Sequence, residues 1–212
     1  MSPENTGPAA VIVLAAGAGT RMKSRTPKIL HEIGGRSLVG HALHAARTIR
    51  PQELALVVRH ERDLVAAHIS AVDPAALIVD QDEVPGTGRA VEAALDALDA
   101  LHPQKQLSGT VVVTYGDVPL LTGELLGELV ATHEAEGNAV TVLTAVLDDA
   151  TGYGRILRAA DGTVTGIREH KDATDAERGI REINSGIYAF DAAVLRDALV
   201  HVTTDNAQGE KY

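Results

Sequence analysis

The stretch VIVLAAGAGTRMKSRTPKILHEIGG, Val11 to Gly35, begins as an apolar strand, breaks into glycine and alanine and then becomes basic. An apolar run that ends in a glycine-rich turn is typical of the first strand of a doubly wound α/β sheet. Ligands of such sheets bind at the carboxyl ends of the strands. The loop that follows Leu14 is therefore the first candidate binding site.

Outward from this loop, apolar runs alternate with alanine- and leucine-rich segments as far as Leu147. We expect strands at 9–17, 53–59, 76–81, 109–117 and 138–147, and helices at 37–49, 61–71, 86–102 and 122–137. The runs are apolar nearly throughout, as in parallel strands covered by helices on both faces. The pattern predicts an α/β fold with a doubly wound, mostly parallel, Rossmann-like sheet. Ser37 is a predicted N-cap, and Gly137 is predicted to close a helix.

After Leu147 the pattern changes to a smaller lobe that contains a hairpin. Asp161-Gly162 is a hairpin turn signal between two short strands. A further strand at 182–190 and a helix at 191–199 follow. We expect one domain, 9–212, with a nucleotide-binding lobe at 9–147, a second lobe at 148–212 and a disordered lead-in at 1–8.

Composition excludes several classes of protein. Among the 212 residues there is no cysteine, so disulfides and thiolate metal sites are ruled out. The net charge of −10 and an aromatic content of 2% argue against nucleic-acid binding. No apolar run approaches the length of a membrane span, and the polar start MSPENTGPAA is not a signal peptide. We expect a cytoplasmic protein without nucleic-acid or membrane partners.

The opening loop suits a polyphosphate. Small residues leave backbone N–H groups uncovered from Ala15 to Gly19, and four cations follow: Arg21, Lys23, Arg25 and Lys28. The loop is neither a dinucleotide fingerprint nor a P-loop, because Met22 stands where both motifs need glycine.

Other residues leave two interpretations open. Asp117 follows a predicted strand, where it is either a Mg²⁺ ligand or a capping aspartate. Gln81 with Gly86-Thr87 is either a reader of a pyrimidine edge or a plain helix start. His41 and His44 lie one helical turn apart but lack a neighbouring carboxylate, which favours a solvated helix face over a metal site. No Gly-x-Ser-x-Gly elbow supports a serine hydrolase.

The longer string LAAGAGTRMKSRTPKILHEIGGRSLV resembles the signature of sugar nucleotidyltransferases, in which Gly-x-Gly-Thr-Arg-Met leads to Pro-Lys. QDEVPGTGRAV resembles the uridine-recognition loop of this family, and VVVTYGDVPLL resembles its metal-binding strand end. GYGRI, IREHKDAT and EINSGIYAF resemble its sugar-binding segments. The ensemble, from Ala10 to the last residue, is similar to the uridyltransferase half of the bacterial bifunctional uridyltransferase–acetyltransferases.

The resemblance implies a fold of the nucleotide-diphospho-sugar transferase type and a Mg²⁺-dependent uridylyltransferase. UTP and N-acetylglucosamine 1-phosphate would give UDP-N-acetylglucosamine, a cell-wall precursor, and pyrophosphate. The alternatives are another sugar-phosphate nucleotidyltransferase and a non-catalytic nucleotide-sugar-binding fragment.

The resemblance also assigns residues. It implies that Arg21 binds the leaving pyrophosphate, that Lys28 reaches the α-phosphate and that Asp117 is the metal ligand, and these three are the catalytic candidates. It implies a sugar pocket lined by Tyr115, Gly116, Gly154, Glu169 and Asn184. Of these, Glu169 and Asn184 suit sugar hydroxyl and acetamido groups. The implied substrate-binding residues are Leu14, Ala15, Ala16, Gly17, Gly19, Lys28, Gln81, Gly86, Thr87, Tyr115, Gly116, Gly154, Glu169 and Asn184.

In the family, the segment that contains Tyr212 leads into a stretch that supplies an asparagine as the second protein ligand of Mg²⁺. A left-handed β-helix that carries acetyltransferase activity and builds a homotrimer then follows. We therefore expect the 212 residues to transfer uridylyl groups weakly, to lack acetyltransferase activity and to lack the trimer contacts.

Overall fold

The computed structural model describes residues 7–19, 22–204 and 209–211. The chain divides into two compact units, which consist of residues 1–141 with 189–212 and of residues 142–188. The predicted lead-in at 1–8 falls largely outside the described residues.

The first unit is built on a parallel sheet. Its strands run in the order β5 (Leu77–Asp80), β4 (Glu53–Val58), β1 (Ala10–Leu14) and β6 (Thr110–Tyr115). In the parallel register, Val11 lies between Leu54 of β4 and Val112 of β6. Every residue of β1 is buried, which explains why the strand is apolar without alternation. The predicted doubly wound α/β sheet is confirmed.

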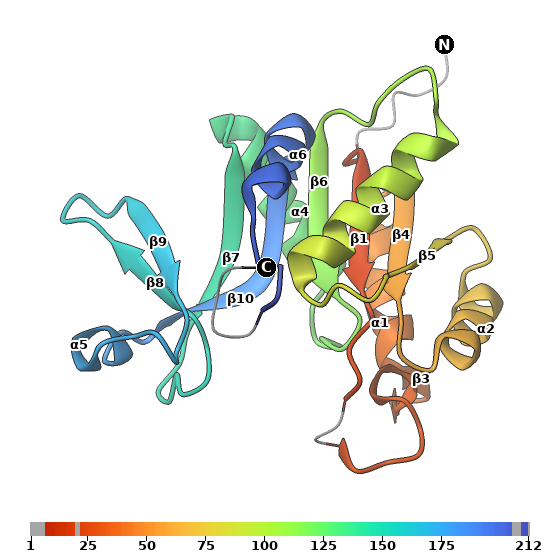
Figure 1. Cartoon of the computed structure of the whole chain (residues 1–212), viewed down its shortest axis with the longest axis horizontal. Coiled ribbons are helices and arrows are strands. Elements are labelled where there is room, and N and C mark those ends of the chain that lie inside the picture. The colour runs from red at the N-terminus through yellow and green to blue at the C-terminus, as the bar shows by residue number, and fades with distance from the viewer. Residues whose placement is uncertain (1–6, 20–21, 205–208, 212) are drawn as a thin grey trace. The chain divides into compact units, whose positions relative to one another are not determined.

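Helices cover both faces of this sheet. On one face, α3 (Thr87–Leu101) and α6 (Ala192–His201) share a core with the alternate β1 residues Ala10, Ile12 and Leu14. Figure 1 shows α3 crossing in front of the strands. The other helices of the unit are α1 (Leu38–Thr48), α2 (Arg62–Val72) and α4 (Gly123–Glu136). Helix α1 contacts β1, α2 and α4.

The end of the chain differs from the expected lobe boundary. Residues 148–212 were expected to form one lobe, whereas residues 189–212 group with the first unit in the structure. The physical reason is that α6 buries Ala192, Leu195 and Leu199 in the core that α3 also fills. Apolar burial against α3 outweighs proximity in sequence to the hairpin.

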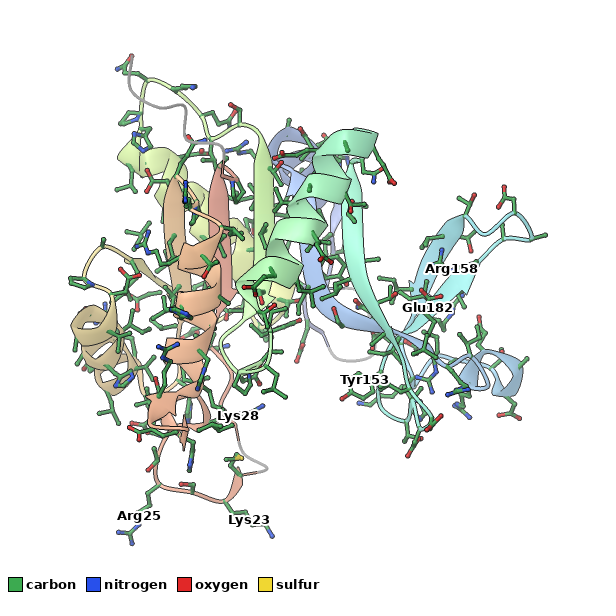
Figure 2. All side chains as sticks on the ribbon, turned by 180° about the vertical axis from the view of Figure 1, so that it is seen from behind. Lys23, Arg25, Lys28, Tyr153, Arg158 and Glu182 are labelled. Carbon is green, nitrogen blue, oxygen red and sulfur yellow. The ribbon has the colours of Figure 1, made fainter. Side chains whose placement is uncertain are left out.

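The second unit contains the expected hairpin. Strands β8 (Arg155–Arg158) and β9 (Val164–Arg168) are antiparallel, and Gly162 turns between them with φ of +89°. β10 (Glu182–Asp191) pairs with both β8 and β7 (Val140–Val146), and a short helix, α5 (Asp175–Arg178), precedes it. Arg158 forks onto Glu182 through Nε and Nη2, at 2.8 and 2.7 Å (Figure 2).

Local signals in the sequence have mixed outcomes. Ser37 caps α1 by accepting a hydrogen bond from Gly40 at 3.0 Å, and Gly137 ends α4 with φ of +62°, as predicted. The 3₁₀ turn η2 (Lys28–Leu30) and the small hairpin of β2 (Glu32–Ile33) and β3 (Arg36–Ser37) were not predicted. Among the described residues, no helix is both long and apolar enough to span a bilayer.

Candidate functional site

A pocket of about 600 Å³ lies at the carboxyl ends of β1, β4, β5 and β6 in the first unit. Its lining contains most of the predicted site residues of the first unit: Leu14, Ala15, Ala16, Gly17, Gly19, Lys28, Gln81, Gly86, Thr87, Tyr115 and Asp117. Gly116 is not among the lining residues, and its N–H donates to the carbonyl of Leu14 at 2.9 Å. Arg21 lies outside the described residues.

The loop after β1 presents a row of backbone donors. The N–H of Ala15 is used within the fold, because it donates to the carbonyl of Val57 at 2.8 Å. The N–H groups from Ala16 to Gly19 donate to no other described residue. A Cβ on Gly17 would meet no described atom within 4 Å, so the approach to these donors is open. Successive free N–H groups form a concavity that binds anions.

Lys28 and Asp117 meet beside this loop. Lys28 begins η2, and its Nζ forms an ion pair with Oδ2 of Asp117, which follows β6. Gly19 makes room for Lys28: it has φ of +59°, and a Cβ there would lie 2.6 Å from the Lys28 Cβ. Lys28 and Asp117 are about one-third exposed, at 36% and 31%, so they are within reach of a ligand in the pocket.

The other basic residues of the loop behave differently. Lys23 and Arg25 are exposed and point away from the sheet, whereas Lys28 lies close to it (Figure 2). Met22 is one of the pocket-lining residues, and its N–H donates to the carbonyl of Gly19 at 2.9 Å. A side chain therefore stands where a P-loop would need bare backbone.

Gln81 organises the opposite end of the pocket. Its Nε2 donates to the carbonyls of Val84 and Gly86, both at 3.0 Å. The amide nitrogen thus closes the loop from Gln81 to Gly86 upon itself. What Gln81 can offer a ligand is its carbonyl oxygen, which is an acceptor.

Of the five residues predicted to line the sugar pocket, Gly154, Glu169 and Asn184 lie together in the second unit, whereas Tyr115 and Gly116 belong to the first. The N–H of Asn184 donates to the carbonyl of Gly154 at 2.9 Å. A Cβ on Gly154 would lie 2.9 Å from Oε1 of Glu169, so only glycine lets that carboxylate approach so closely. Asn184 Oδ1 accepts from the N–H of Gly186 and from the Tyr188 hydroxyl, each at 2.9 Å. Arg155, 2% exposed, donates to the carbonyl of Tyr153 beside this group.

The carboxylates of the pocket limit the kind of metal site it can form. The described residues include no group of three or more His, Cys, Asp or Glu side chains that could hold a metal. His41 is engaged elsewhere, because its Nε2 lies 2.9 Å from the carbonyl of Ile33. The carboxylates in the pocket lining are those of Asp117 and Glu210. A lining of this kind suits an ion that binds through one or two carboxylates and substrate phosphates.

Comparison with known proteins identifies the family to which this fold and pocket belong. Residues 11–183 match the MobA-like NTP transferase domain. The chain belongs to this family.

Several curated proteins are similar to this NTP transferase domain over all 212 of its residues. The chain is 84% identical over 212 residues to "Bifunctional protein GlmU" of Paenarthrobacter aurescens and 82% identical to that of Pseudarthrobacter chlorophenolicus. It is 63% identical over 225 residues to the protein of that name from Micrococcus luteus. All 212 residues are covered in each case, but the chain spans only 42 to 44% of the length of these relatives.

The NTP transferase domain also has pocket residues that sequence reasoning missed. Arg59, which directly follows β4, lines the pocket and donates to the carbonyl of Glu83 at 3.2 Å. Its position after an apolar strand was the signal that could have found it, since strand ends point to the site.

A strap, which we define as residues 209–211, reaches the pocket from the far end of the chain. The carbonyl of Lys211 accepts from the N–H groups of Gly88 and Arg89, at 2.8 and 3.3 Å, and so caps the start of α3. The N–H of Lys211 donates to the carbonyl of Pro85 at 2.9 Å. Gly86 has φ of +121° and allows this close approach of the strap, because a Cβ at this position would lie 2.1 Å from the Lys211 carbonyl oxygen. Glu210 of the strap lines the pocket.

Proposed function

We propose that this NTP transferase domain joins UTP and N-acetylglucosamine 1-phosphate into UDP-N-acetylglucosamine and releases pyrophosphate. The observation that carries the proposal is the meeting of three elements around one pocket: the donor loop 16–19, the Lys28–Asp117 pair and the Gln81 loop. The high identity to proteins named bifunctional GlmU supports it.

The reaction is a displacement at phosphorus. An oxygen of the sugar phosphate attacks the α-phosphorus of UTP, the bond to the bridging oxygen breaks, and pyrophosphate leaves with that electron pair. The nucleophile is already an anion, so no general base is needed. Positioning and electrostatic stabilisation supply most of the catalysis in phosphoryl-type transfers.

In this proposal each end of the pocket binds one part of UTP. The N–H groups from Ala16 to Gly19 bind phosphate oxygens, with Leu14 and Ala15 holding the start of the loop. The carbonyl oxygen of Gln81 accepts from N3–H of uracil, a hydrogen that cytosine lacks. Gly86 and Thr87 bring backbone close to the ring. The capping carbonyl of Lys211 disfavours phosphate at the start of α3, which supports this orientation of the nucleotide.

Lys28, Arg21 and Asp117 are proposed as the charged catalytic groups. Lys28 neutralises the α-phosphate, and Arg21 binds the leaving pyrophosphate. Asp117 would hold Mg²⁺ together with substrate phosphate oxygens; when bound, that ion neutralises phosphate charge. Because Lys28 pairs with Asp117 in the structure, we infer that Lys28 exchanges this partner for a phosphate oxygen when substrates bind.

The sugar is assigned to the second unit. Gly154, Glu169 and Asn184 are held together by the contacts described above, and their carboxylate and amide groups suit hydroxyl and acetamido groups. Tyr115, the last residue of β6, and Gly116, which follows it, are also proposed to contact the sugar.

The test is pyrophosphate release by the 212-residue chain with both substrates and Mg²⁺, with a parallel reaction in EDTA. Release that needs both substrates and the metal, and yields UDP-N-acetylglucosamine, is the expected result. UTP binding without release would support a non-catalytic binding domain. Faster release with another nucleotide or sugar phosphate would support another sugar nucleotidyltransferase. Weak transfer, the absence of acetyl transfer, the absence of a trimer and a cytoplasmic location stay predictions for this chain.

A further inference from the structure

Four charged side chains form a continuous chain beside the candidate uracil end of the pocket. Arg89 donates through Nε and Nη2 to Oδ2 of Asp82, at 2.9 and 2.6 Å. Its third nitrogen, Nη1, donates to Oε2 of Glu92 at 2.6 Å. Lys211 completes the chain by donating from Nζ to both oxygens of Glu92, at 2.9 and 3.0 Å. We call Asp82, Arg89, Glu92 and Lys211 the charge chain.

Three members of the charge chain are more sheltered than an ordinary surface ion pair, whereas the side chain of Asp82 is 45% exposed. The side chains of Lys211, Glu92 and Arg89 are 14, 26 and 27% exposed. Burial alone raises the pKa of Glu92, but hydrogen bonds from Lys211 and Arg89 outweigh it, and the net shift of that pKa is downward. The hydrogen bond from Arg89 likewise lowers the pKa of Asp82. These carboxylates are therefore charged at neutral pH, and networks of this kind are worth more than isolated exposed pairs.

Both ends of the charge chain touch segments that line the pocket. At one end, Oδ1 of Asp82 accepts from the N–H of Val84 at 3.1 Å and so shapes the loop whose carbonyls hold Gln81. At the other end, the backbone of Lys211 is bonded to Pro85 and to the start of α3. Arg89 stands in the middle, on the first turn of α3, and is itself absent from the pocket lining.

We propose that Arg89 is a positioning residue that fixes the Gln81 loop and the strap relative to each other and thereby sets the selectivity for uracil. This inference rests on the proposed function, since it assumes that the nucleotide base lies against Gln81. Only a guanidinium can bind two separate carboxylates with three nitrogens at once, so lysine is an incomplete substitute. Without Arg89, the Gln81 loop and the strap are no longer joined through one side chain. The side-chain carbonyl oxygen of Gln81 is then no longer held in one position.

The test compares Arg89→Met with a matched control at an ion pair that joins the other end of α3 to α6. The pair between Arg196 and Asp99 joins the far end of α3 to α6 with a 2.7 Å contact, and its side chains are 20 and 24% exposed. Neither residue lines the pocket. Arg196→Met therefore removes an ion pair whose burial is close to that of the Arg89–Glu92 pair, without touching the loop or the strap.

For Arg89→Met we expect the KM for UTP to rise about tenfold, the size of coupling found within hydrogen-bonded networks. The preference for UTP over CTP should fall by a similar factor, while kcat and the KM for the sugar phosphate change less than about twofold. Arg89→Lys should recover part of the preference. Arg196→Met should lower the melting temperature but leave the UTP preference intact.

Two results would overturn the proposal. One is an unchanged UTP preference in Arg89→Met; the other is an equal loss of preference in Arg196→Met, which would make the effect a general loss of stability. Calorimetric titration with UTP and CTP gives the same comparison without turnover. If the unmutated chain releases no pyrophosphate, the proposed function fails, yet the titration still decides the role of Arg89.

Discussion

Lys28 and Asp117 are 89 positions apart in sequence, yet their side chains form an ion pair in the pocket that we propose binds the nucleotide. The fold creates this pair by placing the ends of β1 and β6 side by side, with Leu14 opposite Tyr115. One member is a cation suited to phosphate, and the other is an anion suited to a metal. In the proposed reaction this ion pair breaks: Lys28 then contacts a substrate phosphate, and Asp117 contacts Mg²⁺.

Asp117→Asn should abolish most of the uridylyl transfer. A neutral amide offsets a cation poorly, and loss of metal charge stabilisation corresponds to a fall in kcat of about 100- to 1,000-fold. Stability should change by less than about 1 kcal/mol, because the pair with Lys28 is partly exposed. Kinetics and a melting curve should be compared with Asp63→Asn, whose side chain is 96% exposed. Normal turnover of Asp117→Asn with Mg²⁺ would make the metal assignment wrong.

Lys28→Met should lower kcat by about 100-fold, since the ammonium acts on charge that develops in the transition state. The KM for the sugar phosphate should stay nearly unchanged. Lys23→Met is the control, because Lys23 is exposed and points away from the sheet (Figure 2). Equal losses in the two variants would show that general basic charge of the loop, rather than the placement of Lys28, matters.

Gly86→Ala should displace the strap. A Cβ there would overlap the Lys211 carbonyl oxygen at 2.1 Å, and a positive φ adds strain of about 1–3 kcal/mol. We expect lower stability together with a several-fold higher KM for UTP. Gly152→Ala is the matched control: its φ of +87° is also positive, but a Cβ would meet no described atom within 4 Å. If both variants lose stability but keep the KM for UTP, the strap does not shape the pocket.

His133 should make the fold less stable in mild acid. It is buried, with Nδ1 3.0 Å from the Thr141 hydroxyl, and burial lowers its pKa from 6.5 despite the opposing charges of Glu134 and Asp191. Below pH 6.5 the unfolded chain takes up a proton that the folded chain resists, so this contribution to stability falls as pH drops toward the folded pKa. The slope for one group is at most about 1.4 kcal/mol per pH unit.

Urea midpoints at pH 7.5 and 5.5 measure the effect. His133→Gln should lose less stability between the two pH values than the unmutated chain, and the exposed control His60→Gln should behave like the unmutated chain. A parallel loss in all three proteins would assign the acid sensitivity to other groups.

The sequence was sufficient for features that depend on local pattern. Uninterrupted apolar runs identified the buried parallel strands, and the Asp161-Gly162 signal identified the β8–β9 hairpin. Two further local signals were overlooked. The turn between β2 and β3 is Gly34-Gly35, both with positive φ, and Thr174 with Glu177 forms a capping box at α5.

Other features leave no local pattern. Contacts between the strap and Gly86 join distant parts of the chain, so the positive φ of Gly86 reads in sequence as an ordinary helix start. Likewise, nothing in the sequence around Gln81 shows that its amide nitrogen is used to close its own loop. Loop closure, helix capping and the charge chain depend on tertiary contacts. These contacts use some hydrogen-bonding groups of the pocket and so determine which donors and acceptors are left to bind a ligand.

A crystal structure of the chain with UTP, N-acetylglucosamine 1-phosphate and Mg²⁺ tests the central claim most directly. The account predicts uracil against the carbonyl oxygen of Gln81, phosphate oxygens over the N–H groups of residues 16–19, Mg²⁺ on Asp117, and Lys28 on a phosphate oxygen. A nucleotide bound elsewhere, or bound in this pocket with the Lys28–Asp117 pair intact and no metal on Asp117, would contradict it.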